Sequence, residues 1–202
     1  MIVELRQYTL RPGRRDELIE LFDREFVESQ EELGMAVLGQ FRDLDRPDMF
    51  VWLRGFPDMA VRGRALREFY SGPVWKEHGP AANATMLDSD DVLLLRAIVA
   101  PPASARDTRR PPAALRATIW YRERPFDDEF TRWFTGQGTG AVAVAATEYA
   151  ENNFPALPVR EGEHAFVWLG PPAGGEVDVP ERFGVTRTER LRLEPTTRSA
   201  LG

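Results

Sequence analysis

Alternating hydrophobic and polar positions predict several short β-strands along the chain, and the segments between them carry a helical pattern. Residues 2–10 alternate in this way and predict the first strand. In residues 14–33 the apolar positions recur three or four residues apart, which predicts a helix of about five turns. By the same criteria, strands are expected at 35–41, 49–56 and 91–100, and helices at 59–70 and 74–86. The order βαββαβ is that of a ferredoxin-like unit, an antiparallel four-stranded sheet with helices on one face.

The sequence Phe-Val-Trp-Leu occurs twice, at residues 50–53 and at residues 166–169. Residues 113–195 follow the same plan in a shortened form, and the many Pro and Gly residues of 171–184 are incompatible with a second helix there. We therefore predict an α+β fold of two tandem ferredoxin-like units that face each other in a dimeric α/β-barrel arrangement, the second unit being degenerate. The expected boundaries are a first unit at 1–99, a proline-bounded linker at 100–112, a second unit at 113–195 and a tail at 196–202.

Composition narrows the classes of function. The chain has 202 residues, 43% of them hydrophobic, a net charge of −6 and no cysteine, which excludes disulfides, thiolate catalysis and cysteine-ligated metals. The negative charge argues against a nucleic-acid partner. No apolar run approaches the roughly 20 residues that cross a bilayer, and the charges of Glu4 and Arg6 indicate a strand in place of a signal peptide. We expect a cytoplasmic protein with no membrane partner.

Three stretches in the first half resemble the NIPSNAP family: "ELRQYTLRPG" at 4–13, "FVWLRGFPDMAVRGRALR" at 50–67 and Pro-Val-Trp at 73–75. The second half matches only in its plan of strands. The resemblance implies the dimeric α/β-barrel fold, in which two ferredoxin-like sheets enclose a central cavity. Proteins of that fold include cofactor-free monooxygenases, small isomerases and cyclases, and haem proteins, so the resemblance implies no single reaction.

One polar and aromatic strand face is the strongest candidate for a site. Arg6, Tyr8, Trp52 and Arg54 lie on the sides of their strands opposite the aliphatic positions. If the aliphatic sides pack on the helices, these four side chains face the barrel cavity. Arg6, Trp52 and Arg54 would then bind a partly apolar, partly anionic substrate, and Tyr8 would donate a hydrogen bond or relay a proton as a catalytic residue. The alternative is structural: Arg6 pairs with Glu4 or another acid, and the tryptophans fill the sheet interface.

Aligning Leu115-Arg116 with Leu5-Arg6 sets Arg116, Thr118 and Gly170 opposite Arg6, Tyr8 and Arg54. Only one of the three polar groups is then retained. This asymmetry predicts a single site built by the first half, with Trp120 and Trp168 binding substrate from the far wall. It also predicts that Arg54→Ala abolishes ligand binding and leaves the fold intact.

His78 shares a predicted helix face with Trp75, which makes it a candidate general base or axial haem ligand. The alternative is a packing or capping histidine. Arg62, Arg64 and Arg67 are expected on a solvated helix face. No metal-binding or nucleotide-binding motif is present, so no metal and no cofactor are expected. Haem binding through His78 stays an alternative.

These features predict a small enzyme acting on an apolar or aromatic metabolite, of the cofactor-free oxygenase, isomerase or cyclase type. The alternative is a non-catalytic small-molecule-binding or scaffold protein, so whether the chain is an enzyme stays open. A homodimer is possible.

Overall fold

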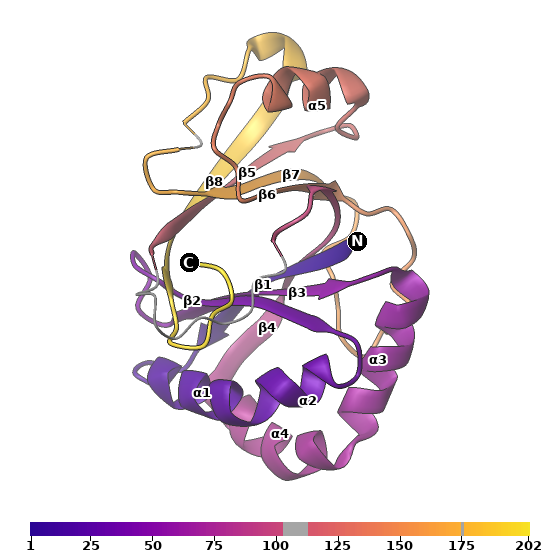
Figure 1. Cartoon of the computed structure of the whole chain (residues 1–202), viewed down its shortest axis with the longest axis vertical. Helices are drawn as coiled ribbons and strands as arrows, with labels where there is room; N and C mark the ends of the chain where they lie inside the picture. Colours follow the sequence, from indigo (N-terminus) through magenta and orange to yellow (C-terminus); the bar gives the residue numbers. More distant parts are fainter. Residues whose placement is uncertain (103–112, 175) are drawn as a thin grey trace.

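The computed structural model describes residues 1–102, 113–174 and 176–202, which fold as an eight-stranded closed antiparallel barrel (Figure 1). The strands of the first half are β1 (Ile2–Leu10), β2 (Ala36–Asp43), β3 (Met49–Phe56) and β4 (Met86–Val99). Those of the second half are β5 (Leu115–Arg122), β6 (Ala143–Thr147), β7 (His164–Gly170) and β8 (Val185–Pro195). The predicted mixture of helices with an antiparallel barrel is confirmed.

Each half of the barrel has the same internal strand order. The first half runs β4-β1-β3-β2 and the second β8-β5-β7-β6, and the two halves join through the pairs β2–β8 and β4–β6. The strand with the repeated Phe-Val-Trp-Leu sequence lies beside the first strand of its half in both cases. Most of the expected linker, residues 103–112, lies outside the described residues.

Helices are distributed unequally over the barrel (Figure 1). The first half carries α1 (Arg15–Leu21), the π-helical segment η1 (Phe22–Phe26), α2 (Val27–Glu31), α3 (Met59–Ser71) and α4 (Pro73–Thr85). The second half carries α5 (Asp128–Thr135), and its described residues between β7 and β8 hold only the 3-10 turn η2 (Glu181–Phe183). Asp58 and Asp127 begin α3 and α5 by accepting hydrogen bonds from the backbone N–H groups of Val61 and Phe130.

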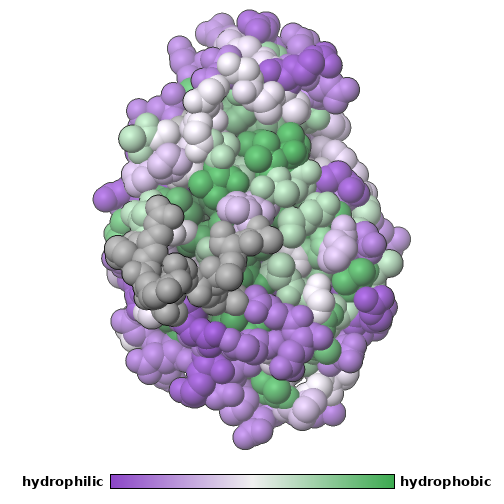
Figure 2. Space-filling view, viewed as in Figure 1, coloured by the Kyte–Doolittle hydropathy of each residue, from purple (hydrophilic) through white to green (hydrophobic). Residues whose placement is uncertain are grey.

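The helices lie outside the barrel on two opposite sides (Figure 1). The buried side chains accordingly form three clusters, one inside the barrel and one under the helices on each side. Hydrophilic residues gather over the two ends of the molecule, and apolar residues are seen between them over the strands (Figure 2). Aliphatic side chains from both halves fill the barrel interior, among them Val3, Leu5, Val51, Leu53, Ile119, Val167 and Leu193. Aromatic side chains pack under α1–α4 on one side and under α5 on the other.

The predicted orientation of the strand faces is therefore wrong. Val3 and Leu5 point into the barrel, whereas Tyr8 and Trp52 point outward, under the helices. The physical reason is that two sheets meeting face to face leave no water between them, so this contact requires aliphatic surfaces on both sides. The helices of the first half carry polar groups of their own, and Gln30 and Arg62 bond to Arg54 and Glu4 on the outer sheet face.

The last residues of the chain are ordered against the barrel. The backbone N–H of Thr196 donates to the carbonyl of Gln40 at 2.8 Å, and the side chain of Leu201 is buried in the interior cluster. The predicted tail thus covers one end of the barrel. No helix in the described part of the chain combines the length and the apolar character that a bilayer crossing requires.

Candidate functional site

A buried carboxylate lies between the first sheet and its helices and binds three arginines. Glu4 Oε2 is 2.8 Å from Arg6 Nη1 and 2.6 Å from Arg54 Nη2, and Glu4 Oε1 is 2.7 Å from Arg62 Nε. All four side chains are fully buried. Strand geometry explains the assembly: Glu4 and Arg54 are directly paired across β1 and β3, Arg6 follows Glu4 on the same face, and Arg62 reaches them from α3.

Helices and a loop supply the remaining partners of this cluster. Arg54 Nη1 donates to Gln30 Oε1 on α2 at 3.0 Å, and Arg62 Nη1 donates to the side-chain oxygens of Asn152 and Asn153 at 3.0 and 2.8 Å. Burial raises the pKa of a carboxyl group, but the three guanidinium groups outweigh this effect and hold the pKa of Glu4 well below its ordinary value. Glu4 therefore stays ionised at neutral pH.

Tyr8 extends the cluster toward a pocket. Arg6 Nε donates to the Tyr8 hydroxyl at 2.9 Å, and the Arg6 guanidinium lies 5.6 Å from the ring centre of Trp52. Burial raises the pKa of Tyr8, although the charge of Arg6 opposes part of this shift. The phenol therefore stays protonated at neutral pH and has a hydrogen to donate.

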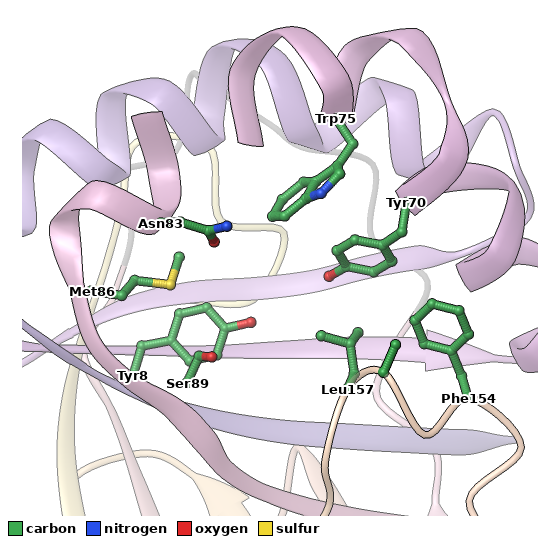
Figure 3. A pocket seen from close by; sticks show the side chains of 9 residues that line it. Tyr8, Tyr70, Trp75, Asn83, Met86, Ser89, Phe154 and Leu157 are labelled. Atoms are coloured by element: carbon green, nitrogen blue, oxygen red, sulfur yellow. The ribbon is translucent and has the colours of Figure 1, made fainter. Parts of the chain in front are cut away.

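The pocket has a volume of about 390 Å³ and lies between the sheet, α3, α4 and the loop formed by residues 148–163, which we call the covering loop (Figure 3). Its walls combine aromatic and apolar side chains with polar groups, which contribute to the lining surface about equally: Tyr8, Tyr70, Trp75, Asn83, Met86, Ser89, Phe154, Ala156 and Leu157. The hydroxyl groups of Tyr8 and Tyr70 point toward each other into the hollow (Figure 3). Tyr8, Tyr70 and Trp75 also line a smaller hollow of about 20 Å³, which Phe22, Phe26 and Trp52 close on its inner side.

The covering loop comes from the second half of the chain but closes a pocket of the first. Phe154 stacks on Tyr70 with a centroid distance of 5.6 Å, and the Asn153 side-chain amide donates to the carbonyl of Met59 at the start of α3. Gly63 permits this approach, because a Cβ at that position would lie 2.7 Å from Asn153 Nδ2. The two halves therefore build the pocket together.

The structure brings together four of the residues predicted for the site, in a place other than the expected one. Arg6, Tyr8, Trp52 and Arg54 form one cluster under the helices, and Arg6 is paired with Glu4 as the structural alternative expected. Since Arg54 is fully buried between Glu4 and Gln30, the expectation that Arg54→Ala leaves the fold intact loses its physical basis. The roles predicted for these residues in substrate binding and catalysis stay predictions.

Trp120 and Trp168 do not join this cluster. They pack under α5 with Phe130, Phe134 and Phe166, on the other side of the aliphatic barrel interior. They are therefore not a far wall of the pocket at Tyr8.

The barrel register also corrects the alignment of the two halves. Trp52 is paired with Arg6, and Trp168 is paired with Thr118. Thr118 is thus the counterpart of Arg6, and Trp120, two residues further on, is the counterpart of Tyr8. By the same register Arg116 corresponds to Glu4, so the second half keeps none of the polar set.

Packing explains why Gly170 stands where the first half has Arg54. The indole of Trp168 folds back across residue 170, and a Cβ there would lie 2.4 Å from Trp168 Cζ2. In the first half the Arg54 guanidinium lies 5.0 Å from the ring centre of Trp52 and occupies this space.

His78 lies apart from the pocket. It is on α4, with Nε2 3.4 Å from a carboxylate oxygen of Glu25, and it is not among the residues that line the hollow. Haem in the pocket would therefore find no axial ligand in the side chain of His78. Within residues 1–102, 113–174 and 176–202, no group of three His, Cys, Asp or Glu side chains is placed to bind a metal ion.

Several residues of the site were not predicted from the sequence. Arg62 was expected in solvent but is fully buried, because α3 packs this side against the sheet. The spacing of Glu4, Arg6 and Tyr8, two residues apart on one strand face, is a usable signal for the cluster. No sequence signal links the covering loop to Tyr70, since that contact depends on the closed barrel.

Comparison with known proteins identifies relatives of the first half and of the whole fold. The NIPSNAP family model matches residues 3–101. A candidate monooxygenase from Fusobacterium nucleatum has a TM-score of 0.63 at 9% identity, covering 96% of this chain and 91% of its own. A candidate monooxygenase from Lactobacillus acidophilus has a TM-score of 0.58 at 13% identity, covering 96% and 93%.

A NIPSNAP-like domain protein of uncharacterized function from Burkholderia xenovorans is 27% identical over 50% of this chain and 89% of its own, with a TM-score of 0.45. No curated protein matches the chain. At 9–13% identity the two full-length structural neighbours establish a shared fold.

Proposed function

The chain belongs to the NIPSNAP family through residues 3–101, and on this basis we propose that it is a small enzyme acting on an apolar or aromatic metabolite in the pocket at Tyr8. One observation carries the proposal. The Tyr8 hydroxyl accepts a hydrogen bond from the buried guanidinium of Arg6 and faces a pocket of about 390 Å³ with aromatic walls. Apolar walls with a few fixed polar groups are typical of small-molecule sites.

The chemistry follows from this pair of side chains. The protonated phenol of Tyr8 donates a hydrogen bond to an oxygen atom of the substrate, and the positive charge of Arg6 stabilises negative charge on that oxygen. Cofactor-free oxygenation, isomerisation and cyclisation all pass through enolate-like or phenolate-like states of this kind. Two proteins of the same fold are candidate monooxygenases, and oxygenation is one of these reactions.

The proposal includes the origin of the barrel. The two halves, 1–99 and 113–195, derive from one ferredoxin-like unit, and only the first retains a chemical site. Their common strand order and the matching places of the two Phe-Val-Trp-Leu strands support this view. We also retain a cytoplasmic location, supported by the absence of cysteine, and a possible homodimer.

A non-catalytic binding protein is the second candidate function. Among the described residues that line the pocket, Tyr8 and Tyr70 are the only titratable ones, so neither a carboxylate nor an imidazole is placed there as a general base. This composition favours binding without turnover. The catalytic role predicted for His78 would require a rearrangement of α4.

The Tyr8→Phe variant distinguishes the two functions. A panel of mono- and bicyclic aromatic ketones, phenols and carboxylic acids is first tested for binding and for consumption by the wild-type protein. If the protein is an enzyme, Tyr8→Phe keeps the ligand in the pocket but lowers turnover by about 10²–10⁴-fold, since it removes the proton donor. Tyr149→Phe is the matched control, because the Tyr149 hydroxyl is bonded to His164 outside this pocket.

Ligands that bind without being consumed would support the binding protein. Unchanged turnover in Tyr8→Phe would contradict the role of Tyr8, and failure of every ligand to bind would contradict the choice of pocket.

A further inference from the structure

The cluster around Glu4 contains more positive than negative charge. One carboxylate faces three guanidinium groups, which leaves two positive charges in excess among fully buried side chains. Burying an uncompensated charge is costly, and proteins normally pair such charges or bring in a counter-ion. The surroundings of Glu4 are therefore suited to one further anionic group.

Unpartnered hydrogen-bond donors also favour an additional anionic group. Arg6 Nη2, Arg62 Nη2 and Trp52 Nε1 are buried and have no hydrogen-bond partner within the described part of the chain. Among the described residues, the buried oxygens without a hydrogen-bond partner are Gln40 Oε1 on β2, Thr118 Oγ1 on β5, and Glu148 Oε2 and Glu163 Oε2, whose carboxylates form ion pairs with Arg96 and Arg160. On β1, β3 and α3, around Glu4, the unpartnered groups are thus donors, and an anion supplies acceptors only.

Covalent geometry shows where the free donor of Arg6 points. In a guanidinium group the Nε–H bond and one Nη2–H bond are parallel and form a planar fork. The Nε–H bond of Arg6 points at the Tyr8 hydroxyl, 2.9 Å away, and Arg6 Nη1 is occupied by Glu4. Arg6 Nη2 therefore points to the same side as the Tyr8 hydroxyl, but it lies behind the pocket wall, because Arg6 itself does not line the pocket.

We propose that the ligand of this pocket carries a carboxylate on an apolar or aromatic body. The Tyr8 hydroxyl, whose oxygen is already bonded to Arg6 Nε, donates to the carboxylate, and the positive charge of Arg6 directly behind Tyr8 favours an anionic head group. The Tyr70 hydroxyl faces the same point from α3, and the aromatic walls enclose the body of the ligand (Figure 3). This inference rests on the proposed function and adds the class of ligand.

The first test compares two probes of equal shape. Calorimetric titration of the wild-type protein with 2-naphthoate and with 2-naphthamide at pH 7 compares an anionic with a neutral head group. We expect 2-naphthoate to bind at least about 10-fold more tightly, since hydrogen bonds to an ionised acceptor are about twice as strong as neutral ones. Equal binding of the two probes overturns the carboxylate proposal and leaves the apolar pocket intact. Failure of both probes overturns the carboxylate proposal and counts against the pocket as well.

The second test removes the positive charge behind Tyr8. Arg6→Met leaves Glu4 with Arg54 and Arg62 and reduces the buried excess of positive charge, so the fold is expected to persist. In this variant the preference for 2-naphthoate over 2-naphthamide should disappear. Arg122→Met is the matched control, a buried arginine of the second half that lies over Phe126, and it should keep the preference.

Tyr8→Phe provides a test that is independent of the folding of Arg6→Met. Removal of one hydroxyl should lower the affinity for 2-naphthoate several-fold and change that for 2-naphthamide less. A preference for the anion that is unchanged in both Arg6→Met and Tyr8→Phe would overturn the proposal.

Discussion

Glu4 is the residue on which the buried arginine cluster depends most. Its two carboxylate oxygens bind three guanidinium groups that come from β1, β3 and α3. Replacing Glu4 by Gln would leave these groups facing one another without a counter-charge in a water-free environment. A single carboxylate thus joins two strands and a helix.

We predict that Glu4→Gln lowers the free energy of unfolding by about 3–5 kcal/mol, because it leaves buried charges uncompensated. Urea denaturation at pH 7 measures the loss. Glu17→Gln is the control, since it removes an exposed partner of Arg14, and it should change the stability little.

The pH dependence of the same variant checks the cause. Because the pKa of Glu4 is lowered from its ordinary value of 4.5, its stabilisation is complete above pH 4.5 and is lost as the pH falls below that value. The difference in stability between the wild type and Glu4→Gln should therefore shrink below pH 4.5. A difference that stays constant with pH would mean that the loss arises from packing alone.

At the scale of elements, the first helix shows both the success and the limit of periodicity. The apolar spacing predicted a helix over 14–33, and the structure has helical turns from Arg15 to Glu31. The π-helical segment at Phe22–Phe26 was not predicted, since apolar residues four positions apart fit an α-helix equally well. This segment presents Phe22 and Phe26 to the inner hollow beside Trp52, and π-helical turns are frequent at functional sites.

The strand faces show what one sequence leaves undecided. Both faces of the first sheet are buried, so alternation identifies two faces without saying which one lines the barrel. The aliphatic face was predicted to pack on helices, as it does in most open sheets. Only the closed barrel reverses this assignment, and closure depends on the pairs β2–β8 and β4–β6 between distant segments.

The contact between α3 and the covering loop gives a prediction about Gly63. Gly→Ala inside a helix normally stabilises by about 1 kcal/mol. At position 63 the added methyl group would meet Asn153, so Gly63→Ala should give no gain in stability and should expose the covering loop to proteases.

A double-mutant cycle with Asn153→Ala tests the cause of this effect. Removing the Asn153 side chain makes room for the methyl group, so the two substitutions should couple favourably in urea denaturation. If Gly63→Ala alone stabilises the protein by the usual amount of about 1 kcal/mol, and the covering loop stays protected from proteases, the contact between residue 63 and Asn153 is not tight.

At the scale of the molecule, closure of the barrel within one chain removes the need for a second copy. The aliphatic face of the first sheet, including Val3, Leu5, Val51 and Leu53, is covered by the second half. Residues 1–99 alone would expose this face to water. The possible homodimer of the full chain is a separate prediction, which light scattering on the purified protein tests.

We predict that a fragment of residues 1–99 associates as a dimer through this face, replacing the second half by a copy of the first. Size-exclusion chromatography with light scattering measures the mass. The same fragment with Leu53→Glu should not form the dimer, because a charge would enter the new interior. A compact monomeric fragment would contradict the prediction.

The indole of Trp168 across Gly170 determines how many ligands the molecule can hold. Two identical single-domain chains in one barrel would offer two equivalent sites, and binding at one would influence the other through their common wall. In this chain the second position is filled by its own tryptophan, and Trp120 stands in the place of Tyr8. If the proposed pocket binds its ligand, we therefore expect one ligand per chain and a hyperbolic saturation curve without cooperativity, which calorimetric titration measures.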